Sequence, residues 1–394
     1  MKALLVILLA TLTVGCTKNI TSTEYPDLDK TIIVYMVADN NLNTNAYNDI
    51  QEMEYALSGI DQTANLIVYI DKNYDSQIGS TPQILRIVAD TDISTIASTV
   101  VKQYSEQDST DPTVVSKVLD DIMTTFPAEQ YGLILWSHST GWLEAAVSST
   151  SASYSTADYG GATMLSFGND NDNEVNNDIL SQALPTNLDF IWFDCCLMGN
   201  AETIYEYRNN ADIIIASPNE VLSYGMPYEK TMPYLIDGDY TGAAKAFFDH
   251  YSNQEKDLVS NYYVDAYATI AVYQTDQIEN LATVISEQTQ RCGGYPTNPN
   301  VSSVQRMAYD SDFLKLFFDL SDGIDCLFDQ QAVDAVDDAL DNLILYKAAT
   351  PTFDYLSMNK YCGITCYLPR TNISATSDDN YYSTLDWAKA VGWD

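Results

Sequence analysis

The pattern that most constrains this fold is a series of short, continuous apolar segments separated by stretches with helical periodicity. Each segment is rich in β-branched residues and lacks polar–apolar alternation, which predicts a strand buried on both faces. Strands of this kind that connect through helices form mostly parallel sheets with helices on both faces. Functional residues of such sheets lie beyond the carboxyl ends of the strands. The segments are 31–38, 66–70, 131–136, 190–193 and 213–216.

Predicted helices fill the intervals between these strands. The segment Pro112–Thr125 is the best defined, because Asp111 can cap its amino terminus and Pro112 suits the first helical position. Further helices are expected at 46–57, 177–184, 197–207, 241–253, 276–289 and 332–347, an edge strand at 83–88, and strands at 262–273 and 361–368. We divide the chain into a core at 31–240 and a C-terminal α/β part at 241–394 that completes or flanks it.

The first residues have the features of an export signal. Lys2 precedes an apolar run from Ala3 to Val14, which is shorter than the roughly 20 residues of a membrane-spanning helix. The run ends in LTVGC, which resembles a bacterial lipobox. We therefore expect a signal peptide at 1–15, acylation of Cys16 and a tether at 16–30, so that the lipid holds an exported protein at the periplasmic or cell-surface side of a membrane. The alternative is cleavage near Gly15 that releases a free protein.

Charge and cysteine content limit the functional classes. The formal net charge of −37 would repel phosphate and excludes nucleic acid as a partner. Two interpretations of this charge stay open, namely solubility outside the cytoplasm and attraction of basic substrates. An exported chain can form disulfides. The sequence does not determine the pairing of the six cysteines that follow Cys16, which are Cys195, Cys196, Cys292, Cys326, Cys362 and Cys366.

Two predicted strand ends carry residues with the chemistry of a thiol nucleophile and its base. His138, one of two histidines in the chain, follows the strand in LILWSHSTGW, and Cys196 follows the strand in DFIWFDCCLM. An imidazole near a thiol can accept its proton, and the two strand ends can be neighbours in one sheet. The alternatives are a structural histidine and a buried core thiol. The other histidine, His250, is expected at the surface of a polar helix.

These segments resemble the clostripain family of cysteine peptidases. The resemblance covers about residues 31–370 and rests on LILWSHSTGW, FIWFDCCLMGNAE, TIIVYMVADNNL, GITCYLP and the stretch from Ala216 to Tyr228. It implies a caspase-like three-layer α/β sandwich with a mostly parallel central sheet and a C-terminal α/β extension. It also implies an endopeptidase that cleaves peptides or proteins after Arg or Lys through an acyl-enzyme intermediate and requires no cofactor for this chemistry.

The resemblance assigns roles to individual residues. His138 is the expected catalytic histidine, and Cys196 is the expected nucleophile. Cys195 occupies a usual Ala position and should point to the opposite face, because neighbours on a strand alternate. Asp194 matches the carboxylate at the base of the S1 pocket and would pair with a basic P1 side chain; its alternative role is a cap on the following helix. Ser139 replaces the family's Gly, whose backbone N–H forms the oxyanion hole with that of Cys196.

Two further questions stay open at this point. The stretch NDNDNE at 169–174 is either a Ca²⁺ site or a solvated loop, and it lacks the glycine of an EF-hand. The alternative to a peptidase is a caspase-like lipoprotein that binds a partner without catalysis, which the 29 tyrosines would suit. Labelling by a thiol-reactive peptide with Arg at P1 separates the two functions.

Overall fold

The computed structural model describes residue 25 and residues 28–72, 79–145, 166–297, 299–308, 316–369 and 377–394. The strands of its main sheet are β1 (Lys30–Ala38), β2 (Ala64–Lys72), β3 (Gln83–Arg86), β4 (Thr99–Gln103), β5 (Gln130–Trp136), β8 (Leu188–Asp194), β9 (Ala211–Ala216), β10 (Thr269–Gln274) and β12 (Ile344–Ala349). Three small two-stranded sheets contain β6 (Phe167–Asp170) with β7 (Asn173–Val175), β11 (Phe318–Asp319) with β15 (Thr365–Cys366), and β13 (Thr352–Phe353) with β14 (Leu356–Ser357).

The helices follow the strands in alternation through the first half of the chain. They are α1 (Asn43–Ser58), α2 (Pro112–Thr125), α3 (Asn177–Ala183), α4 (Ala201–Glu206), α5 (Tyr228–Asp237), α6 (Tyr240–Ser252), α7 (Ile278–Arg291), α8 (Leu320–Leu327), α9 (Gln330–Leu343), α10 (Ser377–Tyr382) and α11 (Asp386–Val391). Helix α2 has its predicted bounds, and the Asp111 carboxylate accepts a hydrogen bond from the N–H of Thr113 as an amino-terminal cap.

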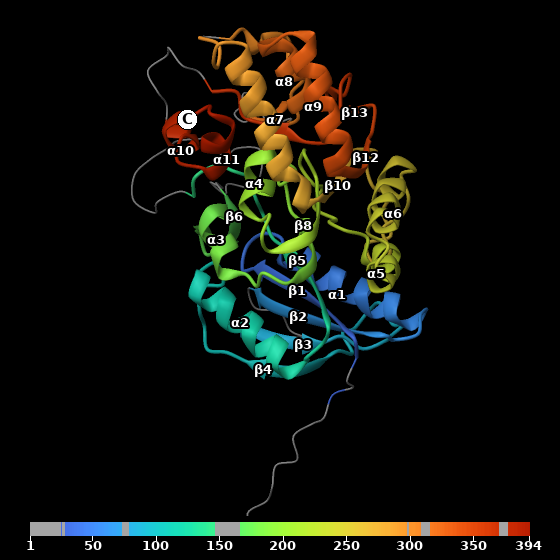
Figure 1. The fold of residues 1–394 in the computed structure, drawn as a ribbon. Coiled ribbons are helices and arrows are strands. Elements are labelled where there is room, and N and C mark those ends of the chain that lie inside the picture. The colour runs from blue at the N-terminus through green and yellow to red at the C-terminus, as the bar shows by residue number, and fades with distance from the viewer. Residues whose placement is uncertain are drawn as a thin grey trace, which may run out of the picture.

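The main sheet has nine strands within the described residues, in the order β12-β10-β9-β8-β5-β1-β2-β3-β4 (Figure 1). The five central strands run parallel, and the outer strands β3, β4, β10 and β12 pair antiparallel. This arrangement confirms the predicted α/β fold with a mostly parallel central sheet. Because β10 and β12 extend the same sheet, strands on both sides of residue 240 share one layer; the division at that residue stays a prediction.

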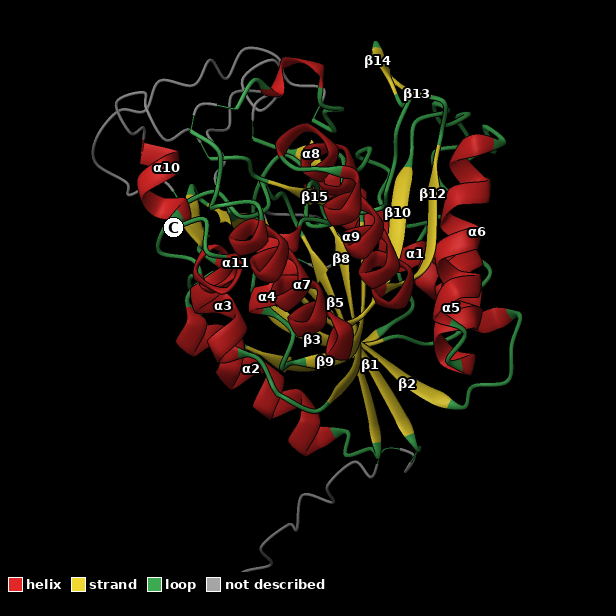
Figure 2. Cartoon of the chain, turned by 45° about the horizontal axis from the view of Figure 1, so that its top comes forward, coloured by secondary structure: helices red, strands yellow, loops and turns green. Residues whose placement is uncertain are grey.

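Helices cover both faces of the sheet, as the continuous apolar strands predict. Helices α1, α5 and α6 lie on one face, and α2, α3, α4, α7, α9 and α11 lie on the other (Figure 2). Side chains of β1 alternate between the two cores, with Ile32, Val34 and Met36 on the α1 side and Ile33, Tyr35 and Val37 on the α2 side. Both sets are buried, which explains why this strand has no polar alternation.

Several predicted elements are wrong in extent. The predicted edge strand is internal, because β4 pairs beyond β3. The helix expected at 332–347 ends at Leu343, and the residues after it form β12. Of the strand expected at 262–273, only the residues from Thr269 onward are a strand, which continues to Gln274. Of the one expected at 361–368, only Thr365–Cys366 is a strand. In each case tertiary pairing rather than local propensity sets the boundary.

His250 also differs from its prediction. It is 2% exposed, its Nδ1 lies 2.8 Å from Lys230 Nζ, and burial lowers its pKa to about 4. It is therefore a neutral structural histidine in α6 and not a surface residue. The predicted signal peptide and Cys16 lie outside the described residues, as does most of the tether. Among the described residues, no helix combines the length and apolar composition that a membrane span needs.

Candidate active site

Loops that follow four parallel strands meet at the carboxyl edge of the sheet. Trp136, the last residue of β5, pairs with Asp194, the last residue of β8. His138 and Cys196 therefore leave the sheet side by side. They line one cavity of about 330 Å³ together with Asn41 after β1 and residues 220–223 and 225 after β9. The structure thus brings the predicted histidine, cysteine and aspartate together at the predicted edge.

The two adjacent cysteines lie in different environments, although both contribute to the cavity wall. Cys195 is 3% exposed and packs into the apolar core on the α2 side. Cys196 is partly exposed, and its Sγ lies 3.4 Å from the backbone nitrogen of Val221. Burial of the sulfur, with smaller effects of Glu220 and Asp194, raises the pKa of the Cys196 thiol to about 12. The thiol is therefore protonated at neutral pH.

A strained residue turns the chain directly after Cys196. Leu197 has φ of 62°, a left-handed conformation that costs an L-residue about 1–2 kcal/mol. The Leu197 N–H donates to the carbonyl of Asn219 at 2.9 Å, which fixes the turn against the loop after β9. Gly141 lies so close that a Cβ there would be 2.6 Å from the Leu197 carbonyl oxygen. Tertiary contacts therefore hold a conformation that the local sequence disfavours, next to the predicted nucleophile.

Asn41 holds the imidazole of His138. The distance between His138 Nε2 and Asn41 Oδ1 is 2.5 Å. An amide oxygen only accepts, so Nε2 carries the proton and Nδ1 is the unprotonated nitrogen. Burial lowers the pKa of His138 to about 4. The resting pair is thus a neutral imidazole and a neutral thiol, and Nδ1 is the nitrogen that can accept a proton.

Ser139 adopts an ordinary backbone conformation. It is not among the described residues with positive φ, so serine replaces glycine here without left-handed strain. Two hydrogen bonds form the bridge between Ser139 and Phe167: Gly168 N–H donates to His138 O, and Thr140 N–H donates to Ser166 O. The N–H of Ser139 takes no part in them. Its hydroxyl lies 2.8 Å from Met198 Sδ. Ser139 is 2% exposed, and the lining of the cavity does not include it.

Asp194 presents a buried, half-satisfied carboxylate to the cavity. Its Oδ2 accepts from the N–H of Met226 at 3.2 Å and from the hydroxyl of Tyr228 at 3.0 Å. Its Oδ1 is buried and has no hydrogen-bond partner among the described residues. Burial raises the pKa of Asp194 to about 6. Helix α4 is capped by Asn200 instead, so the alternative role of Asp194 as a helix cap is wrong.

Further carboxyl groups lie behind Asp194 and make this side of the cavity acidic. Asp49 accepts a 2.7 Å hydrogen bond from the indole of Trp136, which lines the cavity. Burial and the charge of Asp194 raise the pKa of Asp49 well above its usual range. Glu52 accepts from the N–H of Tyr228, and burial also raises its pKa. A cation bound in the cavity would favour the ionised forms of these carboxyl groups, which burial otherwise disfavours.

The chain matches a known protein family over almost its whole length. A model of the Clostripain family matches residues 34–394. The chain belongs to the clostripain family. Clostripain from Hathewaya histolytica is 27% identical to it over 239 residues. That match covers 54% of this chain and 43% of the relative, so the chain spans less than half the length of the curated protein it matches.

Solved structures of clostripain-family proteins have the same fold. An inactive zymogen of a C11 protease from Parabacteroides distasonis is 26% identical, with a TM-score of 0.74 over 93% of this chain and 99% of that one. A secreted C11 cysteine protease from Bacteroides thetaiotaomicron, solved with an irreversible peptide inhibitor, is also 26% identical, with a TM-score of 0.73 and the same coverage. These likenesses confirm the expected caspase-like architecture.

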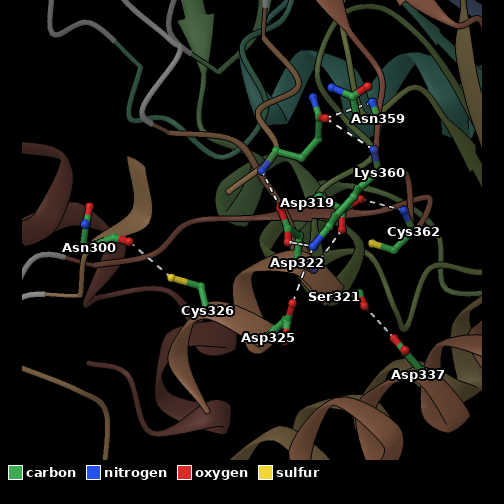
Figure 3. Close-up of polar contacts among 11 residues, drawn as sticks. Asn300, Asp319, Ser321, Asp322, Asp325, Cys326, Asp337, Asn359, Lys360 and Cys362 are labelled. Atoms are coloured by element: carbon green, nitrogen blue, oxygen red, sulfur yellow. Dashed lines mark hydrogen bonds and ion pairs between the residues drawn. The ribbon is translucent and has the colours of Figure 1, made fainter. Parts of the chain in front are cut away.

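A larger cavity of about 560 Å³ lies away from these residues, between α8, α9 and the loop before β15. Four of its carboxylates, those of Asp319, Asp322, Asp325 and Asp337, have partners (Figure 3). Lys360 binds Asp322 and lies 3.5 Å from Asp325, and Asp319 accepts from the N–H of Cys362 at 2.6 Å. We interpret this network as structural, because it joins α8 to the loop before β15.

The acidic stretch at 169–174 forms a tight hairpin between β6 and β7. Asn171 and Asp172 occupy its turn with φ of 49° and 69°, which Asn and Asp tolerate well. Asp170 Oδ2 accepts from the N–H of Ser109 at 2.5 Å. No cluster of three or more His, Cys, Asp or Glu that could hold a metal ion occurs within the described part of the chain. Ca²⁺ binding by this stretch stays a prediction.

Asn41 is the site residue that the sequence did not single out. It lies in the Asn-rich segment DNNLNTN at 39–45, where side-chain amides are common in loops. The available signal was its position directly after the first parallel strand, at the same sheet edge as His138. The sequence marks residues 220–225 only as part of a family segment. In the structure, residues 220–223 and 225 form one wall of the cavity.

Proposed function

We propose that this chain is a cysteine endopeptidase that cleaves peptide bonds after Arg or Lys. The observation that carries the proposal is the convergence of three groups in one cavity. These are the thiol of Cys196, the unprotonated Nδ1 of His138 and the unpaired carboxylate oxygen of Asp194. A thiol, a base and a fixed anion are the groups that acyl transfer with basic P1 selectivity requires.

The first chemical step is acylation. The Sγ of Cys196 attacks the carbonyl carbon of the scissile bond, and the thiol proton passes to Nδ1 of His138. Asn41 keeps the proton on Nε2, which orients the ring for this transfer. Backbone N–H groups near Cys196 and Ser139 stabilise the oxyanion of the tetrahedral intermediate. The intermediate collapses when His138 donates its proton to the leaving amine, which leaves a thioester on Cys196.

The second step is deacylation by water. Nδ1 of the now neutral His138 accepts a proton from water, whose oxygen attacks the thioester carbonyl. The carbon–sulfur bond breaks, and the thiolate of Cys196 takes back the proton from His138. Because the free thiol has a raised pKa, ion-pair formation between Cys196 and His138 is unfavourable without substrate. Proton transfer is therefore coupled to attack rather than complete beforehand.

Selectivity for the P1 residue follows from Asp194. A guanidinium or ammonium group that reaches Oδ1 supplies the partner that this oxygen lacks. An acidic P1 side chain would place a second negative charge beside Asp194 in this cavity. A neutral side chain would leave the ionised Asp194 buried and unpaired, which costs several kcal/mol.

A covalent probe tests the proposal. A peptide with Arg at P1 and a thiol-reactive group in place of the scissile bond should label the wild type and the Cys195→Ala variant. It should not label Cys196→Ala. The same probe with citrulline at P1 is the matched control, because it keeps the shape and removes the charge. Labelling of neither wild type nor Cys195→Ala, both folded, would instead support a binding protein without catalysis.

We also propose that the protein is exported and attached to a membrane by a lipid on Cys16. The support is the apolar run at 3–14 followed by LTVGC. Fractionation of cells that express the wild type or Cys16→Ser tests this. The wild type should sediment with membranes. Mass spectrometry should find the added mass of the lipid on the wild type and not on Cys16→Ser. Equal membrane association of both proteins would refute lipid anchoring.

A further inference from the structure

Three tyrosines stand out as exposed aromatic side chains on two neighbouring loops. Tyr262 and Tyr263 are each 70% exposed, and Tyr355 is 63% exposed. The first two lie in the loop between α6 and β10, and Tyr355 lies at the tip of the β13–β14 hairpin. Tyrosine is enriched at binding interfaces because its side chain combines an apolar ring with a polar hydroxyl.

Both loops are held in place rather than free. Val264 is 1% exposed and anchors the first loop, whose backbone is closed by the 2.9 Å bond from Asp257 N to Tyr262 O. The two loops contact each other through the rings of Tyr267 and Phe353, with centroids 5.7 Å apart. The structure therefore presents the tyrosines on a defined surface.

This surface lies at the same sheet edge as the candidate active site. The carboxyl end of β9 pairs with β10 near the start of β10, and Thr269 in turn pairs with Ala349 at the end of β12. Thr269 Oγ1 also accepts from the N–H of Asn219, next to the cavity wall. Three strand spacings separate β8 from β12, or about 14 Å. An extended peptide covers that distance in about four or five residues.

The chemistry of the surface suits a cationic chain. Lys256 already places its Nζ 5.1 Å from the centroid of the Tyr263 ring, which shows that this ring can receive an ammonium group. The exposed carboxylates Asp265 and Asp354 lie on the same two loops. Tyrosine rings beside carboxylates favour Lys and Arg side chains over acidic ones.

We propose that Tyr262, Tyr263 and Tyr355 form an exosite that binds basic residues of the polypeptide substrate about four or more positions from the scissile bond. This inference rests on the proposed peptidase function and extends it from the P1 residue to the substrate chain. The exosite selects polypeptides with several basic residues, whereas Asp194 selects the residue at the cleaved bond.

The test compares a minimal and an extended substrate. The minimal substrate is a P1-Arg amide with a fluorogenic leaving group, and the extended one is a peptide of about twelve residues with Lys at the distal positions. The test variant is Tyr262→Ala/Tyr263→Ala. The matched control is Tyr234→Ala, because Tyr234 is an exposed tyrosine (43%) on α5. The last turn of α5 accepts a hydrogen bond from Lys30, the first residue of β1. It therefore lies at the amino edge of the sheet, opposite the candidate active site.

The double variant should raise KM for the extended substrate about 4–25-fold, at about 2–5-fold for each exposed cation–π contact. It should leave kcat/KM for the minimal substrate within about twofold, as should Tyr234→Ala for both substrates. Replacing distal Lys by Glu should abolish the difference between the double variant and the wild type. Equal losses on both substrates, or no loss on the extended one, would overturn the exosite.

A binding measurement separates this inference from the peptidase proposal. Fluorescence anisotropy of the labelled extended peptide with Cys196→Ala protein needs no turnover. Tyr262→Ala/Tyr263→Ala in that background should weaken binding by the same factor. This result would support the surface even if the wild type hydrolysed no substrate, whereas unchanged binding would refute it even if the wild type were an active peptidase. Equal binding of the Lys and Glu peptides would likewise refute the cationic specificity.

Discussion

Replacing Asp194 by Asn gives the sharpest test of how this cavity recognises substrate. Asparagine keeps the size of the side chain, and its oxygen can still accept from Met226 N and Tyr228 Oη. The change replaces the charged Oδ1 that a P1 Arg would meet with a neutral NH2 group, which cannot accept from a guanidinium. Loss of a buried partner for a charged group costs about 2–5 kcal/mol. We therefore expect kcat/KM for Arg substrates to fall by about 30-fold to several thousand-fold.

The pH dependence provides a signature that a structural role of Asp194 would not produce. Burial raises the pKa of Asp194 to about 6, so the carboxylate is mostly protonated at pH 5 and mostly ionised at pH 7. For the wild type, kcat/KM for a P1-Arg substrate should rise about tenfold across this interval. The matching P1-citrulline substrate should lack this rise, and Asp194→Asn should lack it for both substrates.

Stability provides the control for Asp194→Asn. A carboxyl group whose pKa is raised on folding stabilises the fold fully below its unfolded pKa, near 4, and loses this contribution as the pH rises through about 6. Ionised Asp194 therefore destabilises the wild type at pH 7, and Asn removes this effect. Urea denaturation should show a variant at least as stable as the wild type. A large loss of stability, or equal losses on Arg and citrulline substrates, would refute the assignment of Asp194 to the S1 pocket.

Three further changes test other parts of the site and fold. Cys196→Ala should abolish peptide hydrolysis while Cys195→Ala largely preserves it, and equal loss in two folded variants would contradict the assignment. Asn41→Ala should lower kcat about 3–10-fold, the value of one hydrogen bond, with Asn41→Asp shifting the acidic limb of the pH–rate profile upward. Burial raises the pKa of Glu202 to about 8, so in urea denaturation Glu202→Gln should add about 3 kcal/mol to the unfolding free energy at pH 7 and little at pH 4.

The sequence predicts the central part of the fold well, because strands buried on both faces appear in the sequence as continuous apolar runs. The five parallel strands lie in continuous apolar runs, and each predicted range lies within about two residues of the observed bounds. The outer strands were harder to predict. In β4, with sequence TVVKQ, three of five residues are exposed, so no apolar run marks this edge strand. In β12 the sequence ILYKAA also suits a helix, and only pairing with β10 makes it a strand.

The location of the candidate site residues could be predicted where they follow those strands, and could not where contacts between loops decide. His138, Cys196 and Asp194 each end or follow a parallel strand, so the sheet rule alone places them at one edge. Nothing in the local sequence indicates that Asn41 reaches the imidazole or that the 220–225 loop closes the cavity. The same limit applies to His250, whose polar helix suggests exposure although Lys230 and neighbouring elements bury it.

The electrostatics of the site link these separate observations. Burial lowers the pKa of His138, raises that of Cys196 and raises that of Asp194, and each shift disfavours the charged form that catalysis or recognition requires. Without substrate, the groups are closer to neutral than in an exposed site. A cationic P1 side chain favours the ionised form of Asp194, because it supplies the missing opposite charge. It follows that binding of a basic residue is coupled to ionisation of the pocket, so part of the selectivity should appear as proton release on binding at pH near 6.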